Sequence, residues 1–156
     1  MLIIEKRIGK LAALNISRVG KENDDKLILK CRFEATISDH AVRRAMGLDL
    51  IPDFWDENDE DRNPRYWSIL NIDLEGKFKN QSLKFADIAF DSCEISAVSI
   101  EPLPKGEAAV SFTARIAFPA PDKVAAMASR LQDEFYLTVD AQPDLLEDNE
   151  GRGSDV

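Results

Sequence analysis

The chain has 156 residues, of which 44% are hydrophobic and 31% charged, and its formal net charge is −9. A chain of this length forms one globular domain, and its ordinary apolar fraction excludes global disorder. No apolar run approaches the roughly 18 residues that a membrane-spanning helix needs, and the segment before Glu5 is too short for the apolar core of a secretory signal. We therefore expect a cytoplasmic protein that makes no membrane contact.

The first half of the chain alternates between apolar and polar residues, as β-strands do. Residues 12–17 and 27–37 follow this period of two, and the turn-forming residues 19–26 between them predict a β-hairpin. Residues 38–47 begin with a serine that can cap a helix and end with a glycine that can close one, which predicts a short helix. Residues 49–66 have no period and are rich in Asp, Asn and Pro, which predicts a long acidic loop.

The second half of the chain adds more strands and a second helix. Residues 70–79 alternate strictly, and residues 85–100 form one or two strands in which the apolar positions change from odd to even numbers. Such a change of face predicts a β-bulge. Apolar residues at helical spacing predict the second helix, from residue 123 to about residue 134. The remaining elements are a strand at 110–118, a strand at 135–139 and a disordered acidic tail at 143–156.

These elements together predict a fold of the α+β class. Hairpins favour antiparallel strands, and two helices can cover one face or one end of the resulting sheet. We therefore expect one domain over residues 1–142, built on a mostly antiparallel sheet that is curved or forms a partly open barrel, with two short helices. The acidic loop at 49–66 belongs to this domain, and the flexible tail at 143–156 follows it.

Residue types that carry catalysis are scarce. His40 is the single histidine, and Cys31 and Cys93 both fall on the apolar face of a strand pattern, where a free cysteine is buried and inert. The chain has no nucleophile-elbow, phosphate-binding or dinucleotide-binding motif. The carboxylates of residues 53–61 do not fit the spacing of an EF-hand, although a less regular loop for a divalent ion stays open. We expect no enzyme activity, no cofactor and no metal site.

Charge is unevenly distributed along the chain. Residues 1–48 carry a net +4, whereas residues 49–66, 67–140 and 141–156 carry −5, −4 and −4. Both tryptophans lie in or beside the acidic loop, and aromatic side chains surrounded by charge are typical of binding hot spots. Our leading hypothesis is therefore a non-enzymatic binding or accessory protein that acts through a macromolecular partner, with a protein as the expected partner. Its predicted contact surface consists of Trp55, Asp56, Glu57, Asp59, Glu60, Asp61, Tyr66 and Trp67.

Two other hypotheses use the same charges differently. A basic N-terminal hairpin followed by an acidic tail resembles the layout of single-stranded-DNA-binding proteins, in which the tail competes with DNA for the basic groove. This layout implies single-stranded nucleic-acid binding, with phosphate contacts by Lys30, Arg32, Arg43 and Arg44. Alternatively, the acidic loop and tail imitate phosphate charge and occupy a basic groove on another protein. Size, acidity and the missing catalytic motifs are typical of a phage or prophage accessory protein, and association into homo-oligomers stays open.

Overall fold

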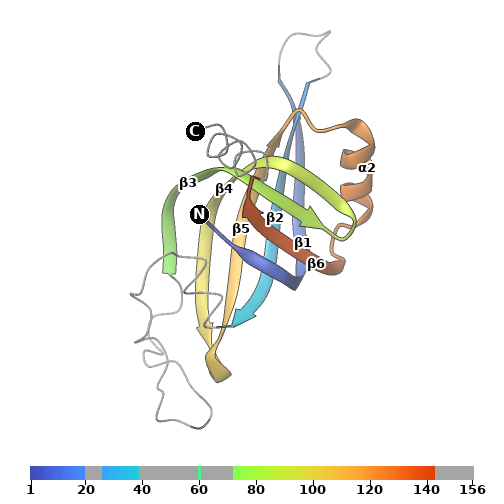
Figure 1. Cartoon of the computed structure of the whole chain (residues 1–156). Coiled ribbons are helices and arrows are strands. Elements are labelled where there is room, and N and C mark those ends of the chain that lie inside the picture. The colour runs from blue at the N-terminus through green and yellow to red at the C-terminus, as the bar shows by residue number, and fades with distance from the viewer. Residues whose placement is uncertain (20–25, 39–59, 61–71, 143–156) are drawn as a thin grey trace, which may run out of the picture.

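The computed structural model describes residues 1–19, 26–38, 60 and 72–142 of the chain. Six strands and one short α-helix lie in this part of the protein (Figure 1). The helix packs at one side of the curled sheet, where its Lys123 donates to the carbonyl of Ala89 (2.6 Å). In chain order the elements are β1 (Ile4–Arg18), β2 (Leu27–Ser38), β3 (Ile72–Phe85), β4 (Ile88–Leu103), the 3₁₀ turn η1 (Pro104–Gly106), β5 (Glu107–Ala117), α2 (Pro121–Ser129) and β6 (Glu134–Ala141).

The six strands form a sheet that closes on itself. Every neighbouring pair is antiparallel, and the order of neighbours is β1-β2-β5-β4-β3-β6, with β6 returning to β1. Consecutive strands supply three of the pairings, whereas β2–β5, β3–β6 and β1–β6 join strands that are far apart in the sequence. The predicted mostly antiparallel sheet is therefore confirmed. The strands form a closed ring, whereas we expected a curved sheet or a partly open barrel.

Inward-facing side chains from all six strands fill the interior of the ring. Successive residues of a strand point to opposite faces, so each strand sends about every second side chain inward. Phe33 of β2 is fully buried there, with its ring centre 5.2 Å from that of Phe85 and 5.5 Å from that of Phe112. Cys31 and Cys93 are buried and free, as the alternation predicted. Removing this apolar surface from water is the main source of stability for the fold.

The predicted bulge is present within β4. The register of β4 against β5 shifts between Ser96 and Ser99, and Ala97 between them has a positive φ of 51°. The irregularity moves the inward positions from odd to even numbers, so that Ile95 and Val98 are both buried. The prediction of a bulge is therefore confirmed, and the segment is one continuous strand rather than two.

β3 keeps the predicted alternation at residues 73–79, where Leu74 and Phe78 pack against the core, although the strand is irregular along its length. Its register against β4 shifts three times along its length, and Gly76 and Asn80 have positive φ values of 98° and 57°. The strand bends at these points, and its fully buried apolar residues, Leu83 and Phe85, come from its C-terminal end. The predicted inward face is therefore confirmed at Leu74 and Phe78. The bulges move the inward positions to odd numbers only further along the strand, at Gln81, Leu83 and Phe85.

The second predicted helix is present but shorter than residues 123–134. Val124 and Met127 are buried against the sheet, as their helical spacing predicted. The helix ends early because the chain turns, with Gln132 at a positive φ of 71°, before β6 begins. Leu131, which the spacing placed on the buried face, is 42% exposed. The predicted C-terminal end of this helix was therefore wrong.

Several predicted segments fall outside the described residues. Ser38 is the last residue of β2, and the remainder of the predicted helix at 38–47 lies outside. The acidic loop at 49–66 is described at Glu60 alone, and the tail at 143–156 also lies outside. The predicted division into a domain and a tail therefore stays a prediction.

A buried glutamine joins the N-terminal residues to the sheet through hydrogen bonds. Among the described residues, Gln81 of β3 is the one buried polar side chain, at 1% exposure. Its Nε2 donates to the carbonyls of Leu2 (2.6 Å) and Asp140 (3.2 Å), and its Oε1 accepts from the backbone N–H of Leu2 (2.9 Å). Leu2 precedes β1 and is fully buried, so this side-chain amide satisfies backbone groups that lie outside the strand ladder.

Candidate functional site

The closed sheet opens where β1 separates from β2. The Cα pairing of these two strands ends at Gly9, opposite Ala35. N-terminal to Gly9, β1 pairs with β6 instead, while β2 continues alongside β5. A wedge-shaped opening therefore lies between residues 4–8 of β1 and residues 36–38 of β2. We call this opening the β1–β2 notch.

Gly9 is the corner at which β1 changes its partner. It is buried and pairs with Ala35 on one side and with Phe135 on the other. A Cβ atom at this position would lie 2.9 Å from Cδ2 and 3.0 Å from Cβ of Leu137, closer than side chains normally pack. The absence of a side chain therefore lets β6 approach and close the ring beside the notch.

Backbone groups of one residue from each strand face the notch. Successive residues of a strand direct their N–H and C=O groups to opposite sides. The carbonyl of Leu27 accepts from the N–H of Phe118 (2.8 Å), so odd-numbered residues of β2 face β5, and Thr36 faces β1. The N–H of Leu11 donates to the carbonyl of Asp133 (3.3 Å), and its carbonyl accepts from the N–H of Gln132 (2.8 Å), so the backbone groups of Leu11 face the side of β6. Ile8 is three residues away, so its backbone groups point to the opposite side, toward β2. These two residues would form the next pair of the β1–β2 ladder, but the ladder has already ended.

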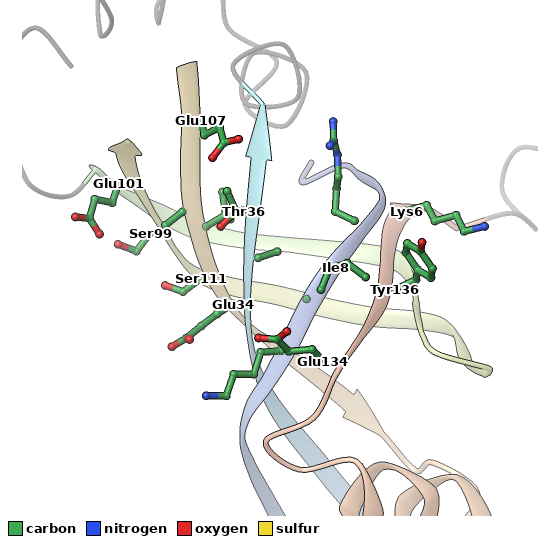
Figure 2. A pocket seen from close by; sticks show the side chains of 16 residues that line it. Lys6, Ile8, Glu34, Thr36, Ser99, Glu101, Glu107, Ser111, Glu134 and Tyr136 are labelled. Carbon is green, nitrogen blue, oxygen red and sulfur yellow. The ribbon is translucent and has the colours of Figure 1, made fainter. Parts of the chain in front are cut away.

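The notch opens into a groove of about 830 Å³ on the outer surface of the sheet. Five strands line the groove, and only β3 does not contribute to it. In the view of Figure 2, Thr36 lies between two groups of side chains. One group contains Ser99, Glu101, Glu107 and Ser111, and the other contains Lys6, Ile8 and Tyr136.

Charged side chains of both signs line the groove. Glu34, Glu101 and Glu107 lie on β2, β4 and β5, and we call these three residues the acidic rim. Within the described part of the chain, none of the three carboxylates forms an ion pair or a hydrogen bond. The opposite side carries Lys6, Arg7 and Lys10 of β1 and Glu134 of β6. Lys10 is the Cα partner of both Glu34 and Glu134. An oppositely charged ligand group would therefore find the rim carboxylates unoccupied.

An exposed apolar pair stands beside the basic residues. Ile8 of β1 and Tyr136 of β6 are Cα partners, and they are 50% and 55% exposed. The Nζ atom of Lys6 lies 5.1 Å from the centre of the Tyr136 ring, within the range of a cation–π contact. Single exposed apolar side chains are normal on proteins. Two adjacent ones that include a tyrosine and line a groove are typical of a contact surface.

A second charged surface forms around one of the residues predicted to bind nucleic acid. Lys30 is exposed on the outer face of β2, and the register places it opposite Arg115 of β5. Sequence reasoning missed Arg115, because its pairing with Lys30 joins strands that are far apart in the chain. Like charges directly opposite each other destabilise a sheet. On its other side Arg115 lies opposite Glu94 of β4, which compensates part of this repulsion and itself lies 3.6 Å from Nζ of Lys77.

Arg32, also predicted to contact phosphate, has protein partners instead. Its Nη1 donates to the carbonyl of Ala97 (3.2 Å) and to Oγ1 of Thr113 (3.2 Å), and its Nη2 donates to Oγ of Ser111 (2.8 Å). The guanidinium thus joins β2 to β5 and to the bulge of β4. A phosphate contact by Arg32 would have to compete with these three hydrogen bonds.

Most of the predicted partner-contact surface lies outside the described residues. Glu60 is described, and it is exposed in a turn. His40 and two of the basic residues predicted to contact phosphate also lie outside. The predicted site residues outside the described part are Arg43, Arg44, Trp55, Asp56, Glu57, Asp59, Asp61, Tyr66 and Trp67.

The two interior thiols are held in their protonated form. Burial raises the pKa of Cys31 to about 12, with a smaller contribution from the nearby Cys93, and burial alone raises the pKa of Cys93 to about 12. Thiolates are the reactive form of cysteine, so both side chains act as core residues at neutral pH. In the described ranges, no group of three or more His, Cys, Asp or Glu side chains could hold a metal ion.

No protein-family model, curated protein or solved structure matches this chain. The interpretation of the groove therefore rests on its own geometry and chemistry. No helix in the part of the chain that the structure describes is long and apolar enough to cross a membrane.

Sequence reasoning did not identify the groove, although one signal for it was present. The predicted strand at 135–139 places Phe135 and Leu137 on one face, and this alternation puts Tyr136 on the other face. Residues 4–10 show no clean alternation, and we did not predict a strand there. The partner exchange of β1 at Gly9 leaves no pattern that a polar and apolar alternation could reveal.

Proposed function

We propose that this protein is a non-catalytic binding protein that acts through a macromolecular partner, and that the groove at the β1–β2 notch is a contact surface. The observation that carries the proposal is the combination of the exposed Ile8–Tyr136 pair with an acidic rim that has no protein partner in the described part of the chain. Both features line the same open groove.

The character of the lining supports a macromolecular ligand. Small-molecule sites are mostly apolar and bury most of the ligand. This groove is lined largely by charged and hydroxyl side chains, including Ser99, Ser111 and Thr36, and it lies on the outer face of the sheet. Partner surfaces combine such polar positions with a few large aromatic contacts.

The test compares two exposed aromatic residues. Tyr136→Ala removes the aromatic side chain of the groove, and Phe118→Ala removes a residue of similar exposure (58% against 55%) that does not line it. We expect a macromolecule captured from the native host by the unchanged protein to be retained by Phe118→Ala and lost by Tyr136→Ala. Equal retention by both variants would refute the groove as a contact surface, provided that both variants melt like the parent.

The acidic and aromatic loop remains a second contact surface in this proposal. Its sequence supports the role, because Trp55 lies among carboxylates that can attract a basic partner. Trp55→Ala is expected to weaken partner binding and to leave the melting temperature unchanged. A large fall in melting temperature would instead assign Trp55 to the core.

Single-stranded nucleic acid is the second candidate partner, and the pairing of Lys30 with Arg115 favours it. The net negative charge of the chain does not prevent nucleic acid from binding to the sheet. The described residues contain 14 Lys and Arg against 14 Asp and Glu, so the net charge of −9 comes from the remaining segments, which contain 6 against 15. A neutral sheet with a local basic pair can contact a phosphate backbone.

The nucleic-acid candidate predicts binding that weakens as salt concentration rises. Each phosphate contact on a single strand contributes about −0.7 to the slope of log affinity against log salt. Lys30→Ala and Arg115→Ala should each make this slope shallower by about that amount in anisotropy titrations of a labelled oligonucleotide. Lys84→Ala, on β3, serves as the control with no expected change. No binding at low salt would remove this candidate.

A further inference from the structure

We infer that the β1–β2 notch binds an extended peptide, which adds a strand to the sheet and carries alternating apolar and basic side chains. This inference rests on the proposed function, because it specifies the partner for the same groove. Such a peptide requires three features of the site: backbone groups for strand pairing, an apolar contact, and charges opposite to those of the peptide.

Backbone groups for strand pairing are available where the β1–β2 ladder ends. Ile8 and Thr36 direct their N–H and C=O groups toward the notch from opposite sides, and both residues are exposed. An unpaired strand edge is a template for a further strand, and peptides recognised in this way gain most of their affinity from main-chain hydrogen bonds. β1 and β2 stay paired as far as Gly9 and separate beyond it, so only a few residues of each strand are available to pair with a peptide.

Side chains of an added strand would alternate between two faces, and the groove offers a different environment to each. One environment is the apolar Ile8–Tyr136 pair, which suits a branched aliphatic side chain. The other is the acidic rim of Glu34, Glu101 and Glu107, which suits lysine or arginine. Specificity in strand addition comes from such contacts with alternate side chains.

The same charges disfavour other occupants. Four glutamates line this groove against the three basic residues Lys6, Arg7 and Lys10, so a phosphate backbone would meet a net negative charge, and the repulsion is strongest at the acidic rim. The C-terminal segment 143–156 of this chain carries five acidic residues and one basic residue, so the rim repels it as well. A basic extended peptide has the complementary charge.

The experiment uses a fluorescein-labelled octapeptide of alternating valine and lysine and the full-length protein. Anisotropy titration is expected to give a dissociation constant below about 1 mM. Two control peptides have the same side chains but are N-methylated at every valine or at every lysine, so each lacks the N–H donors of one edge. Loss of one or two backbone hydrogen bonds corresponds to about a tenfold weakening, which we expect for at least one of them.

Hydrogen exchange locates the bound peptide. The amides of Ile8 and Thr36 should exchange at least tenfold more slowly when the peptide is present. A double variant of the rim, Glu101→Gln with Glu107→Gln, should bind the peptide at least fivefold more weakly. The matched control, Glu75→Gln with Asp91→Asn, changes two exposed carboxylates that do not line the groove and should bind as the parent does.

The outcomes separate this inference from the proposed function. Equal affinity for all three peptides, or unchanged exchange at Ile8 and Thr36, overturns strand addition. Failure of the octapeptide to bind at 1 mM overturns it too, while the capture experiment with Tyr136→Ala still tests the groove. Protection of the same amides by a single-stranded oligonucleotide instead of the peptide would assign the notch to nucleic acid and overturn the inference.

Discussion

The side-chain amide of Gln81 should account for a large part of the stability of the closed sheet. Gln81→Ala removes the donor to the carbonyls of Leu2 and Asp140 and the acceptor for the N–H of Leu2. Leu2 is fully buried, so water cannot replace these partners while the N-terminus stays in place. The variant must therefore either keep unsatisfied backbone groups in the interior or release the N-terminal residues from the sheet.

Both alternatives have a cost that can be compared. Each buried group left without a partner costs about 1–3 kcal/mol, and at least two groups of Leu2 are affected. Release of the N-terminus instead exposes the Leu2 side chain, which costs roughly 1.5–3 kcal/mol and is partly offset by the entropy of the freed residues. The cheaper route, release of the N-terminus, limits the effect, so we expect the free energy of unfolding to fall by about 1–3 kcal/mol. The melting temperature should fall by roughly 2–12 °C.

Urea denaturation followed by circular dichroism measures this change. The matched control is Gln132→Ala, which removes an exposed hydrogen bond of 2.7 Å from Nε2 to the carbonyl of Ala12. Exposed hydrogen bonds exchange readily with water, so the control should cost less than about 1 kcal/mol. Similar losses for the two variants would refute the reasoning that burial makes the Gln81 bonds important. A smaller m-value in Gln81→Ala would indicate that the N-terminus is already released in the native state.

Three further predictions concern the corner, the bulge and the core. Gly9→Ala should destabilise the protein by about 1–2 kcal/mol in urea denaturation, since its Cβ would overlap Leu137, and an unchanged midpoint would show that β6 can move away. Arg32→Ala should cost about 1–2 kcal/mol through its three hydrogen bonds; a loss below about 0.5 kcal/mol would leave Arg32 free for a ligand. The pKa of Cys31 and of Cys93 is about 12 in the folded protein, against about 9.0 for an unfolded thiol. The stability that follows from keeping these thiols protonated is therefore fully present below pH 9 and is lost as the pH rises toward 12. Denaturation at pH 8 and pH 10.5 should show this fall, and replacement of both cysteines by alanine should reduce it.

The alternation of apolar and polar residues was enough to identify strands wherever one face of a strand is buried along its whole length. In β2 the apolar positions from Leu29 to Ile37 are all buried, as the alternation predicted, because burial selects apolar residues at every second position. The bulge in β4 was also readable, since it shifts a long apolar pattern by one residue. In β3 the alternation identified the inward-facing Leu74 and Phe78, but it did not reveal the change to odd-numbered inward positions from Gln81 to Phe85, because a polar residue occupies the first of them.

Which strands become neighbours, and where the sheet opens, could not be read from any local pattern. The pairings of β1 with β6 and of β2 with β5 depend on closure of the ring, which is a property of all six strands together. These pairings bring Ile8 to Tyr136 and Lys30 to Arg115, from strands separated by most of the chain. A local pattern records the environment of each residue but not the identity of its neighbour across the sheet. The candidate contact surfaces of this protein are built from such neighbours.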